Sequence, residues 1–473
     1  QKKCNKMAIA QIRNTKAAQG IYPAYQDLVV SVSTIQILAN GTTYFYPNGY
    51  IDALNLKMIL EVYVDDVLAA TLKKPRNEFS NALFNIDSVI QDYLSTDVNQ
   101  YIATDANTRN AIHKTPKYSK NNTSLVKVFL KAGIEYTNSV TGNFFSSVSD
   151  TQQSGSGFIN APFFVFNGTQ QNRDGELLDI STYIAAGASS QTLSDYPQGS
   201  LSTASPQRIR KSDYATMAFF NGVYKRFDTD AGITSDVNNI LVTFRDAAGS
   251  TVFSFTHNNT IAQGGSVGTD DMTTDGGLLF RGVGVQNMID AGLVTLGDIT
   301  NAVDYVITYR ETGNTTAYAS MVYEIQDEDC KGFETIRLAW LNSLGAWDYY
   351  NFTKKSTRDT NSRRTTFTQD YGYALNSPTN AYEQGTNEGG LQAFTNTVTQ
   401  SIEANTDFIS EEIAAVLESL FTSPKVQLQN ASGDWENVIV TEKSYTKQTS
   451  TNDKLIQYVI GVQYSHNKTV QKL

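Results

Sequence analysis

The segment Tyr63-Val64-Asp65-Asp66 carries two adjacent carboxylates at a point where the chain is expected to turn between two strands. In polymerases, paired carboxylates at a hairpin tip hold the magnesium ions that assist phosphoryl transfer. That chemistry also requires further carboxylates, a basic template channel and a helical domain, whereas this chain is acidic and rich in strand patterns. We therefore expect a solvated hairpin turn here and no polymerase site.

Two other acidic clusters, Asp270-Asp271 and Asp327-Glu328-Asp329, could bind calcium through carboxylate oxygens. Neither lies in a loop of about 12 residues with a glycine and a closing glutamate. We expect solvated loops, with an adventitious structural ion as the alternative. Glycoside hydrolysis also needs two carboxylates, but their separation across a sugar cannot be derived from a sequence.

The three histidines, His113, His257 and His466, and the two cysteines, Cys4 and Cys330, show no zinc-type spacing. His113 is expected in a polar, basic loop, and none of the histidines has an evident nucleophile beside it, so a histidine-based enzyme is not expected. A Cys4–Cys330 disulfide and two reduced thiols both stay open, and we favour the reduced thiols. The sequence thus predicts no metal site.

Glycine pairs occur at Gly155 and Gly157 and at Gly282 and Gly284, but neither completes a dinucleotide-binding fingerprint. The chain also lacks the glycine-lysine-serine or threonine run of a phosphate-binding loop and the Gly-x-Ser-x-Gly elbow of hydrolases. We interpret the glycine pairs as turns or bulges. No cofactor, no catalytic residue and no enzymatic activity are predicted.

Composition narrows the classes of partner. The chain has 473 residues and a net charge of -10, and aromatic residues make up 11% of it against 18% charged residues. An acidic chain without a long Lys/Arg stretch is a poor electrostatic partner for nucleic acid. No run of about 18 apolar residues occurs, so we expect no membrane span. The Tyr, Asn, Thr and Gly content favours strands and polar turns.

Hydrophobic periodicity predicts a mainly β fold of several antiparallel β-sandwich domains with a few short helices. We divide the chain into an N-terminal arm at 1–20, a β-rich domain with one helix at 21–160, a β-sandwich-like middle domain at 161–330, and a C-terminal hairpin, helix and antiparallel sheet at 331–473. Helices are expected at 86–94, capped by Asn85, and after Ser410, with Ile413, Val416, Leu417 and Leu420 on one face. The strongest predicted hairpins lie at 58–69, 240–256, 303–325 and 334–352, and 353–392 is a long polar stretch.

The predicted strand 346–352 carries large rings on both faces, with Trp347 and Tyr349 on one and Tyr350 and Phe352 on the other. A small domain can cover one such face with its own core. We expect the second face to be an exposed patch that contacts another protein, which makes these four residues candidate interface residues. The alternative is a strand buried between two layers of the same subunit.

Three segments together carry a resemblance to a known group of proteins. They read MILEVYVDDVLAATLKKP at 58–75 with FNIDSVIQDYL at 84–94, IRLAWLNSLGAWDYYNF at 336–352, and DFISEE at 407–412 with LFTSPKV at 420–426. This combination resembles virion structural proteins of tailed bacteriophages, in particular distal-tail-like tail and baseplate components of phages that infect aquatic bacteria and Bacteroidetes.

The resemblance implies a non-catalytic structural component of the tail, baseplate or collar, located in the virion. Its expected partners are copies of itself in a homo-oligomeric ring and other tail proteins. The composition agrees with large interfaces made of aromatic anchors and hydrogen-bonding polar groups. It agrees equally with a secreted or surface carbohydrate-binding module or a glycan-active enzyme, which stays as the alternative function.

Overall fold

A computed structural model describes the chain in two compact units. Unit 1 comprises Gln1–Glu328 and Leu341–Tyr349, and unit 2 comprises Asp329–Trp340 and Tyr350–Leu473. The residues that the structure describes are 9–12, 21–33, 35–37, 43–45, 53–77, 81–100, 111–150, 162–169, 183, 191–198, 206–220, 237–259, 277–311, 320–326, 332–369, 374–376, 381–383, 389–442, 456–468 and 470.

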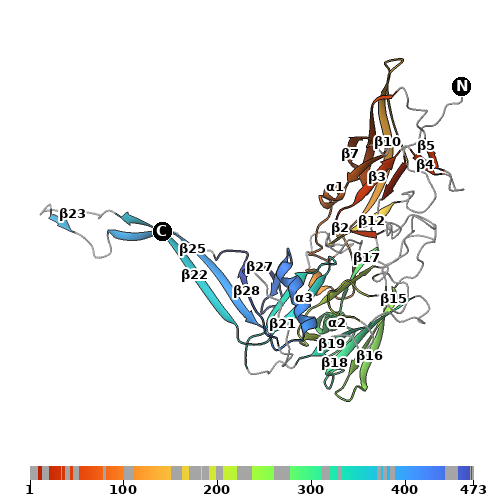
Figure 1. Ribbon diagram of the computed structural model, residues 1–473. Helices are drawn as coiled ribbons and strands as arrows, with labels where there is room; N and C mark the ends of the chain where they lie inside the picture. Colours follow the sequence, from red (N-terminus) through yellow and green to blue (C-terminus); the bar gives the residue numbers. More distant parts are fainter. Residues whose placement is uncertain are drawn as a thin grey trace. The chain divides into compact units, whose positions relative to one another are not determined.

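A six-stranded sheet forms the main layer of the N-terminal half of unit 1 (Figure 1). Its strands run in the order β2 (Ile21–Tyr25), β12 (Phe163–Thr169), β10 (Leu125–Asn138), β6 (Ala53–Val64) and β7 (Val67–Pro75), with β11 (Phe144–Asp150) paired to β10. The register places Val128 opposite Val64 and Leu130 opposite Val62, and all four are buried. Alternate residues of both strands therefore face one core, as the period of two requires.

A three-stranded sheet covers that core with its own apolar residues. It consists of β1 (Ile9–Ile12), β3 (Val29–Ser33) and β8 (Asn81–Asn85). The helix that follows, α1 (Asp87–Gln91), is shorter than the predicted 86–94. Asn85 lies in β8 and Ile86 is the N-cap residue by position, but the Asn85 side chain accepts a hydrogen bond from the Asp87 amide at 3.5 Å, so Asn85 contacts the first turn as predicted. Of the predicted apolar stripe, Ile86, Ile90 and Leu94 are buried, Val89 is half-buried and Tyr93 is exposed.

Two further sheets and a small hairpin complete unit 1. The five-stranded sheet has the order β13 (Gln207–Ile209), β19 (Met321–Ile325), β18 (Asp304–Glu311), β15 (Val237–Arg245) and β16 (Thr251–Asn258). The three-stranded sheet has the order β14 (Thr216–Phe220), β17 (Leu278–Gly282) and β9 (Tyr118–Lys120), and β4 (Ile35–Ile37) pairs with β5 (Thr43–Phe45). Short helices lie at η2 (Ile112–Lys114) and α2 (Val285–Asp290).

Strand pairing crosses the boundary predicted between residues 160 and 161. Strand β12 follows that boundary in sequence, yet it pairs with β10 and, in parallel, with β2. Likewise β17 of the middle segment pairs with β9. The parts predicted at 1–20, 21–160 and 161–330 thus belong to one compact unit by their contacts, apart from the last two residues. Their division into separate domains stays a prediction.

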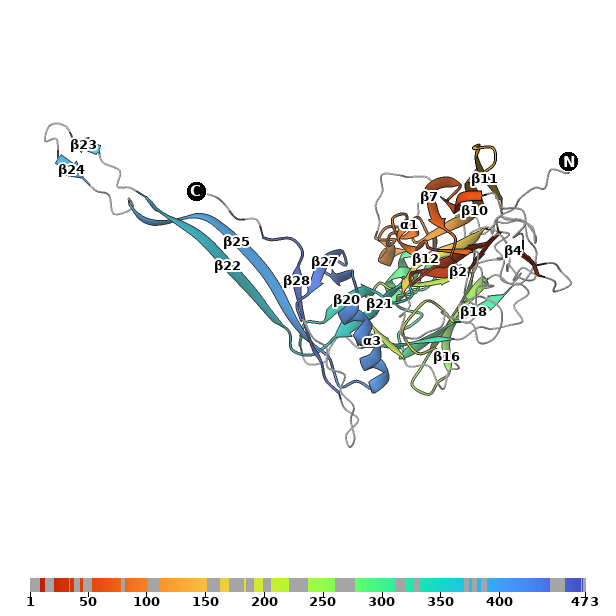
Figure 2. The same cartoon turned by 45° about the horizontal axis from the view of Figure 1, so that its top comes forward.

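Unit 2 is built on a seven-stranded antiparallel sheet and one helix. The strand order is β21 (Trp347–Phe352), β20 (Ile336–Leu341), β26 (Val426–Gln429), β27 (Trp435–Val440), β28 (Val459–Tyr464), β25 (Gly390–Asn405) and β22 (Thr357–Gln369). Figure 2 shows β22 and β25 as a long pair that extends beyond α3 (Glu411–Thr422), β27 and β28, with β23 (Ala374–Asn376) and β24 (Ala381–Glu383) at its far end.

The α3 helix confirms its sequence prediction. Ser410 is the N-cap, and its side chain accepts a hydrogen bond from the Ile413 amide at 3.4 Å. Val416, Leu417 and Leu420 are buried, while Ile413 is only half-buried and Ala414 takes its place in the core. The indole Nε1 of Trp340 donates to the Ser419 hydroxyl at 2.9 Å, which fixes the helix against β20.

The fold class is confirmed: the chain is mainly β, with several antiparallel sheets and few short helices among the described residues. The predicted hairpins at 58–69, 240–256, 303–325 and 334–352 all occur as strand pairs. In the part of the chain that the structure describes, no helix is long and apolar enough to cross a membrane.

Candidate functional site

Asp65 and Asp66 occupy the tight turn between β6 and β7, both with positive φ angles. The Asp65 carboxylate accepts a hydrogen bond from the backbone amide of Lys127 at 2.9 Å, and Asp66 pairs with the Lys127 ammonium at 2.8 Å. Both aspartates are exposed. The two carboxylates fix the turn to the neighbouring strand β10, which is the expected role of a solvated hairpin.

The histidine predicted to lie in a polar loop is instead buried in unit 1. His113 lies in η2, and its Nδ1 is 2.7 Å from the hydroxyl of Tyr349, which is also 2.7 Å from the Thr216 hydroxyl. The His113 ring packs edge-on against Trp347 at 4.6 Å between ring centres. Histidine, tyrosine and threonine side chains thus meet, and all three are buried.

The tip of the 334–352 hairpin, Leu341–Tyr349, is held in unit 1 by buried polar groups. The carboxylate of Asp348 accepts hydrogen bonds from the Ser194 hydroxyl at 2.6 Å, the Asp195 amide at 2.9 Å and the Asn342 side chain at 3.0 Å. Burial raises the pKa of Asp348 to about 7, and the negative charge of Asp195 adds to this. The indole of Trp347 donates to the backbone carbonyl of Asp97 at 3.0 Å.

These contacts correct the expected exposed aromatic patch. Trp347, Tyr349, Tyr350 and Phe352 are each at most 4% exposed within the chain. The alternative interpretation, a strand covered on both faces by its own chain, describes them. The expectation failed because partners for Trp347 and Tyr349 come from residues more than a hundred positions away in sequence, which strand periodicity does not reveal.

A second buried cluster surrounds Arg281 on β17. Its guanidinium donates to the backbone carbonyls of Pro116 at 3.1 Å and Lys117 at 3.3 Å, and to that of Gly282, and it lies over the ring of Tyr118. Burial raises the pKa of Tyr118 to about 12, whereas burial and the charge of Arg281 lower the pKa of His257 to about 4. His257 is therefore neutral at physiological pH and stacks on Tyr118.

The predicted turns at Gly282 and Gly284 are a strand end and a helix N-cap. At both positions the space that a Cβ would occupy is filled by backbone, near Thr115 and near Ala215. Glycine is needed at these two positions because other backbone segments pack too closely for a side chain, so no nucleotide site has to be invoked. Gly155 and Gly157 lie outside the described residues.

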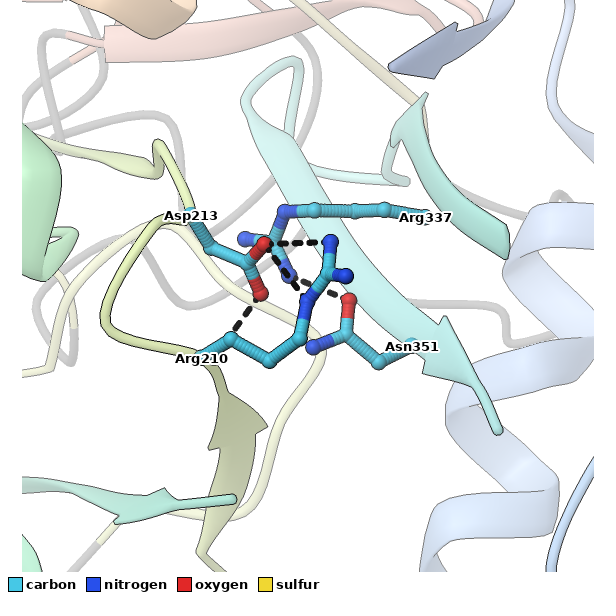
Figure 3. Close-up of polar contacts among 4 residues, drawn as sticks. All are labelled: Arg210, Asp213, Arg337 and Asn351. Carbon is cyan, nitrogen blue, oxygen red and sulfur yellow. Dashed lines mark hydrogen bonds and ion pairs between the residues drawn. The ribbon is translucent and has the colours of Figure 1, made fainter. Parts of the chain in front are cut away.

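Two other arginines, Arg210 and Arg337, are also held by protein groups. Figure 3 shows two such pairs, one in each unit: in unit 1 the Arg210 guanidinium pairs with the buried Asp213 at 2.8 Å, and in unit 2 Arg337 donates to the Asn351 side chain at 2.8 Å. No group of three or more His, Cys, Asp or Glu side chains among the described residues could hold a metal ion. His466 is exposed. Cys4, Cys330 and the acidic clusters at 270–271 and 327–329 lie outside the described residues.

The exposed feature of unit 2 is the strand pair β22–β25, which we call the arm. All 13 residues of β22 are exposed, and β22 is the edge strand of its sheet. Among the described residues, strand β25 pairs with β28 from Ser401 to Asn405, with one further bridge from Val398 to Lys468, and beyond that bridge the described part of the arm consists of β22 and β25. A hairpin of two strands is marginally stable in water without a partner.

Apolar side chains lie exposed near the far end of the arm. Phe367, Leu391 and Phe394 are 42%, 71% and 62% exposed. A β-bulge places Phe394 outside the regular pairing, since Thr365 pairs with Thr395 and Thr366 with Ala393. Its ring packs edge-on against Phe367, with ring centres 6.3 Å apart. Paired exposed rings on an open strand edge are features of a protein contact surface.

The sequence prediction missed this arm, because 353–392 reads as a polar stretch. Neither face of β22 is buried, so the apolar alternation that reveals strands is absent. A weaker signal was present in the β-branched residues, since β22 contains five threonines among its 13 residues.

The site that the geometry favours is therefore an assembly surface on the arm, while the buried clusters around Asp348 and Arg281 hold unit 1 together. Comparisons with protein-family models and with curated protein sequences find no match for this chain.

Proposed function

We propose that this chain is a structural component of a tailed-phage virion, in the tail, baseplate or collar, that assembles by protein–protein contacts through its arm. The observation that carries the proposal is the arm itself, an exposed two-stranded extension in which β22 is an edge strand among the described residues and the rings of Phe367 and Phe394 are exposed. Natural proteins limit such edges because they pair with other chains. A long open edge that the fold retains is suited to pairing with a partner.

The rest of the described chain supports a scaffold role for this protein. The polar and titratable side chains that could do chemistry, such as His113 and Asp348, are buried and bonded within unit 1. Such networks fix one arrangement of the strands around them. The link to tailed phages comes from the resemblance of the segments at 58–94, 336–352 and 407–426, and the β-rich fold is compatible with it.

Two experiments test the proposal. The first is mass spectrometry of purified tailed particles from the source of the sequence, in which we expect peptides of this chain in many copies per particle. If the chain is absent from the particles and the purified chain binds a polysaccharide, the carbohydrate-binding alternative would be favoured.

The second experiment replaces residues 360–400 with a short Gly-Ser linker and measures incorporation into complexes with the products of neighbouring genes. A chain with the same linker inserted at Ala248, in the exposed β15–β16 turn, is the matched control. We expect the arm deletion to abolish incorporation with little change in melting temperature, because the removed residues contribute few buried side chains. Normal incorporation of the arm deletion would contradict the proposed function.

A further inference from the structure

The hairpin of β10 and β11 ends one side of the six-stranded sheet of unit 1, and we call its residues 136–149 the β10–β11 tip. Figures 1 and 2 both show the turn of this hairpin as a loop that projects from the end of the sheet. Residues 136–149 contain no charged side chain, in a chain of which 18% is charged. Residues 53–56, at the start of the neighbouring strand β6, are uncharged as well. This uncharged end belongs to unit 1, whereas the arm belongs to unit 2.

Three apolar side chains are exposed at this end of the sheet. Leu54, Val140 and Phe144 are 53%, 76% and 68% exposed. In the register, Thr137 of β10 lies opposite Leu54 on one side and opposite Phe144 on the other. Directly paired residues share a face of the sheet, so Leu54 and Phe144 lie on the same face, and Val140 lies in the turn beyond them. Exposed apolar side chains that gather in this way mark a contact site.

A β-bulge turns Leu54 toward solvent. In the regular part of β6 the even-numbered residues face the core, as Leu56 and Met58 do. The pairing with β10 then shifts between Glu135 and Thr137, and Asn55 has a φ of 56°, which is uncommon for a residue other than glycine. The extra residue places Leu54 on the outer face, where regular alternation would have buried it. The backbone therefore holds an apolar side chain outside the core.

The backbone of the turn forms its hydrogen bonds within the turn. The Asn138 side-chain oxygen accepts from the amides of Val140 at 2.9 Å and Thr141 at 3.0 Å. The Asn138 carbonyl accepts from the Gly142 amide at 2.8 Å, and the Asn138 amide donates to the Asn143 carbonyl at 2.9 Å. The apolar layer of a membrane offers no hydrogen-bond partners, so a segment enters it at low cost only when its backbone groups are already paired. The amides of these four residues meet that condition.

Charged side chains begin directly behind the uncharged end. In the next row of the outer face, about 7 Å back along β10, Lys57 lies opposite Glu135. The ammonium groups of Lys57 and Lys73 are 3.4 Å and 2.5 Å from the Glu135 carboxylate, and both lysines are about half exposed. Asp150, which ends the uncharged stretch of β11, lies opposite Lys131.

Asp52 precedes β6 and lies outside the described residues. Two exposed lysines thus share one buried glutamate at the level where the uncharged end stops.

We propose that the β10–β11 tip enters the interfacial layer of a lipid bilayer, with Leu54, Val140 and Phe144 in the apolar part and Lys57 and Lys73 at the lipid phosphates. The charges support this occupant, because an uncharged apolar end followed by exposed ammonium groups is complementary to acyl chains followed by phosphates. The spacing of about 7 Å agrees with the roughly 5–10 Å to which interfacial segments are buried. Three apolar side chains are also too few for a stable protein interface, which uses roughly 20–30 residues on each side.

The test is flotation of the full chain with phosphatidylcholine vesicles. We expect the wild type to float with the vesicles, and Val140→Ser with Phe144→Ser to lower the partition coefficient at least about tenfold. The matched control is Val67→Ser with Leu68→Ser, which removes two side chains that are 62% and 47% exposed where β7 leaves the aspartate turn at the other end of β6. The control should bind like the wild type. Both double variants should keep the wild-type melting temperature, because all four side chains are exposed.

Two single variants test the depth and the charge of the contact. Phe144→Trp should add fluorescence that lipids brominated in their acyl chains quench, whereas the fluorescence added by Leu68→Trp should not be quenched. Lys57→Glu places a negative charge at the level of the phosphates and should lower the partition coefficient, while Lys73 keeps Glu135 paired.

A wild type that does not float with the vesicles would overturn the proposal. Equal flotation of the Val140 and Phe144 double variant would also overturn it, because lipid would then bind another surface. If the wild type fails to float and the same double variant is lost from assembled particles, the tip contacts a protein and not a membrane. None of these outcomes bears on the arm, so the proposed function is tested separately.

Discussion

Asp348 allows a direct measurement of how tightly the hairpin tip is bound in unit 1. Its carboxyl group is buried among the Ser194 hydroxyl, the Asp195 amide and the Asn342 side chain. All three groups donate hydrogen bonds, which favours the ionised form, but burial dominates and raises the pKa to about 7. The folded state consequently holds a proton at pH values where the unfolded chain has lost it.

The magnitude follows from the difference between this pKa and that of an unfolded aspartate, about 3.9. A difference of roughly three pH units corresponds to about 4 kcal/mol at about 1.4 kcal/mol per unit. Because the folded pKa is the higher one, the stabilising proton is fully present below about pH 4. The free energy of unfolding should then fall as pH rises from about 4 to about 7 and stay level above that.

Asp348→Asn is the variant that isolates this effect. An amide oxygen in place of Oδ2 would keep the bonds from Asp195 and Asn342, and the amide nitrogen would donate to the Ser194 hydroxyl. Urea unfolding of both proteins at about pH 4.5, 6 and 8 gives the comparison, in which the other titrating groups cancel. We expect near-equal stability at the lowest pH and an advantage of up to about 4 kcal/mol for the variant at the highest.

Two outcomes would refute this reasoning. The first is a wild type and a variant with the same pH dependence, which would mean that Asp348 does not titrate between about pH 4 and 7. The second is a variant less stable than the wild type at pH 8 by 2 kcal/mol or so, the cost expected when a buried hydrogen-bonded charge is lost. That result would show that the three donors keep the carboxylate ionised.

Three further substitutions test other parts of the structure. Leu417→Ala should lower the free energy of unfolding, measured by chemical denaturation, by about 2–5 kcal/mol, because Leu417 is fully buried in α3. A cost below about 1 kcal/mol would mean that this face of the helix is only weakly packed. Gly345→Ala should cost more than about 1 kcal/mol, since Gly345 has a φ of +77° and a Cβ would overlap the Asn167 carbonyl; an unchanged melting temperature would contradict this turn. Val252→Lys should slow aggregation at high concentration and change stability by less than about 0.5 kcal/mol, because β16 is an exposed edge strand without charge. Unchanged light scattering would show that β16 does not mediate aggregation.

Sequence patterns predicted the elements that bury one face. In β6 and β10 the even-numbered residues from Met58 and from Val128 onward enter the core, and this alternation is visible in the sequence. Helix α3 was equally clear, since Ser410 and Leu417 satisfy a cap and an apolar stripe. Short-range information sufficed in these cases because the core lies on one side of each element.

Hydrophobic periodicity could not predict contacts between residues that are far apart in the sequence. His113 and Tyr349 are separated by 236 positions, yet they share a buried hydrogen bond. Similarly, Asp348 reads as an ordinary polar residue between aromatic neighbours, and only the folded chain brings Ser194 and Asn342 to its carboxylate. The predicted loop position of His113 was wrong for this reason: its polar sequence neighbours gave no sign of the aromatic residues that enclose it.

Two hairpins, the one at 334–352 and the arm that follows it, show why aromatic content was a misleading guide to the contact surface. The aromatic strand β21 is buried along its whole length within its own chain. Strand β22, rich in threonine and arginine, gains little by burial within its own chain, so it stays exposed with its edge open. Hydrophobic patterns find what a chain buries for itself, whereas a surface reserved for a partner must remain soluble before assembly. Under the proposed function, polar strands of high β-propensity with a few rings at one end, such as Phe367 and Phe394, are the sequence pattern to search for in assembly arms.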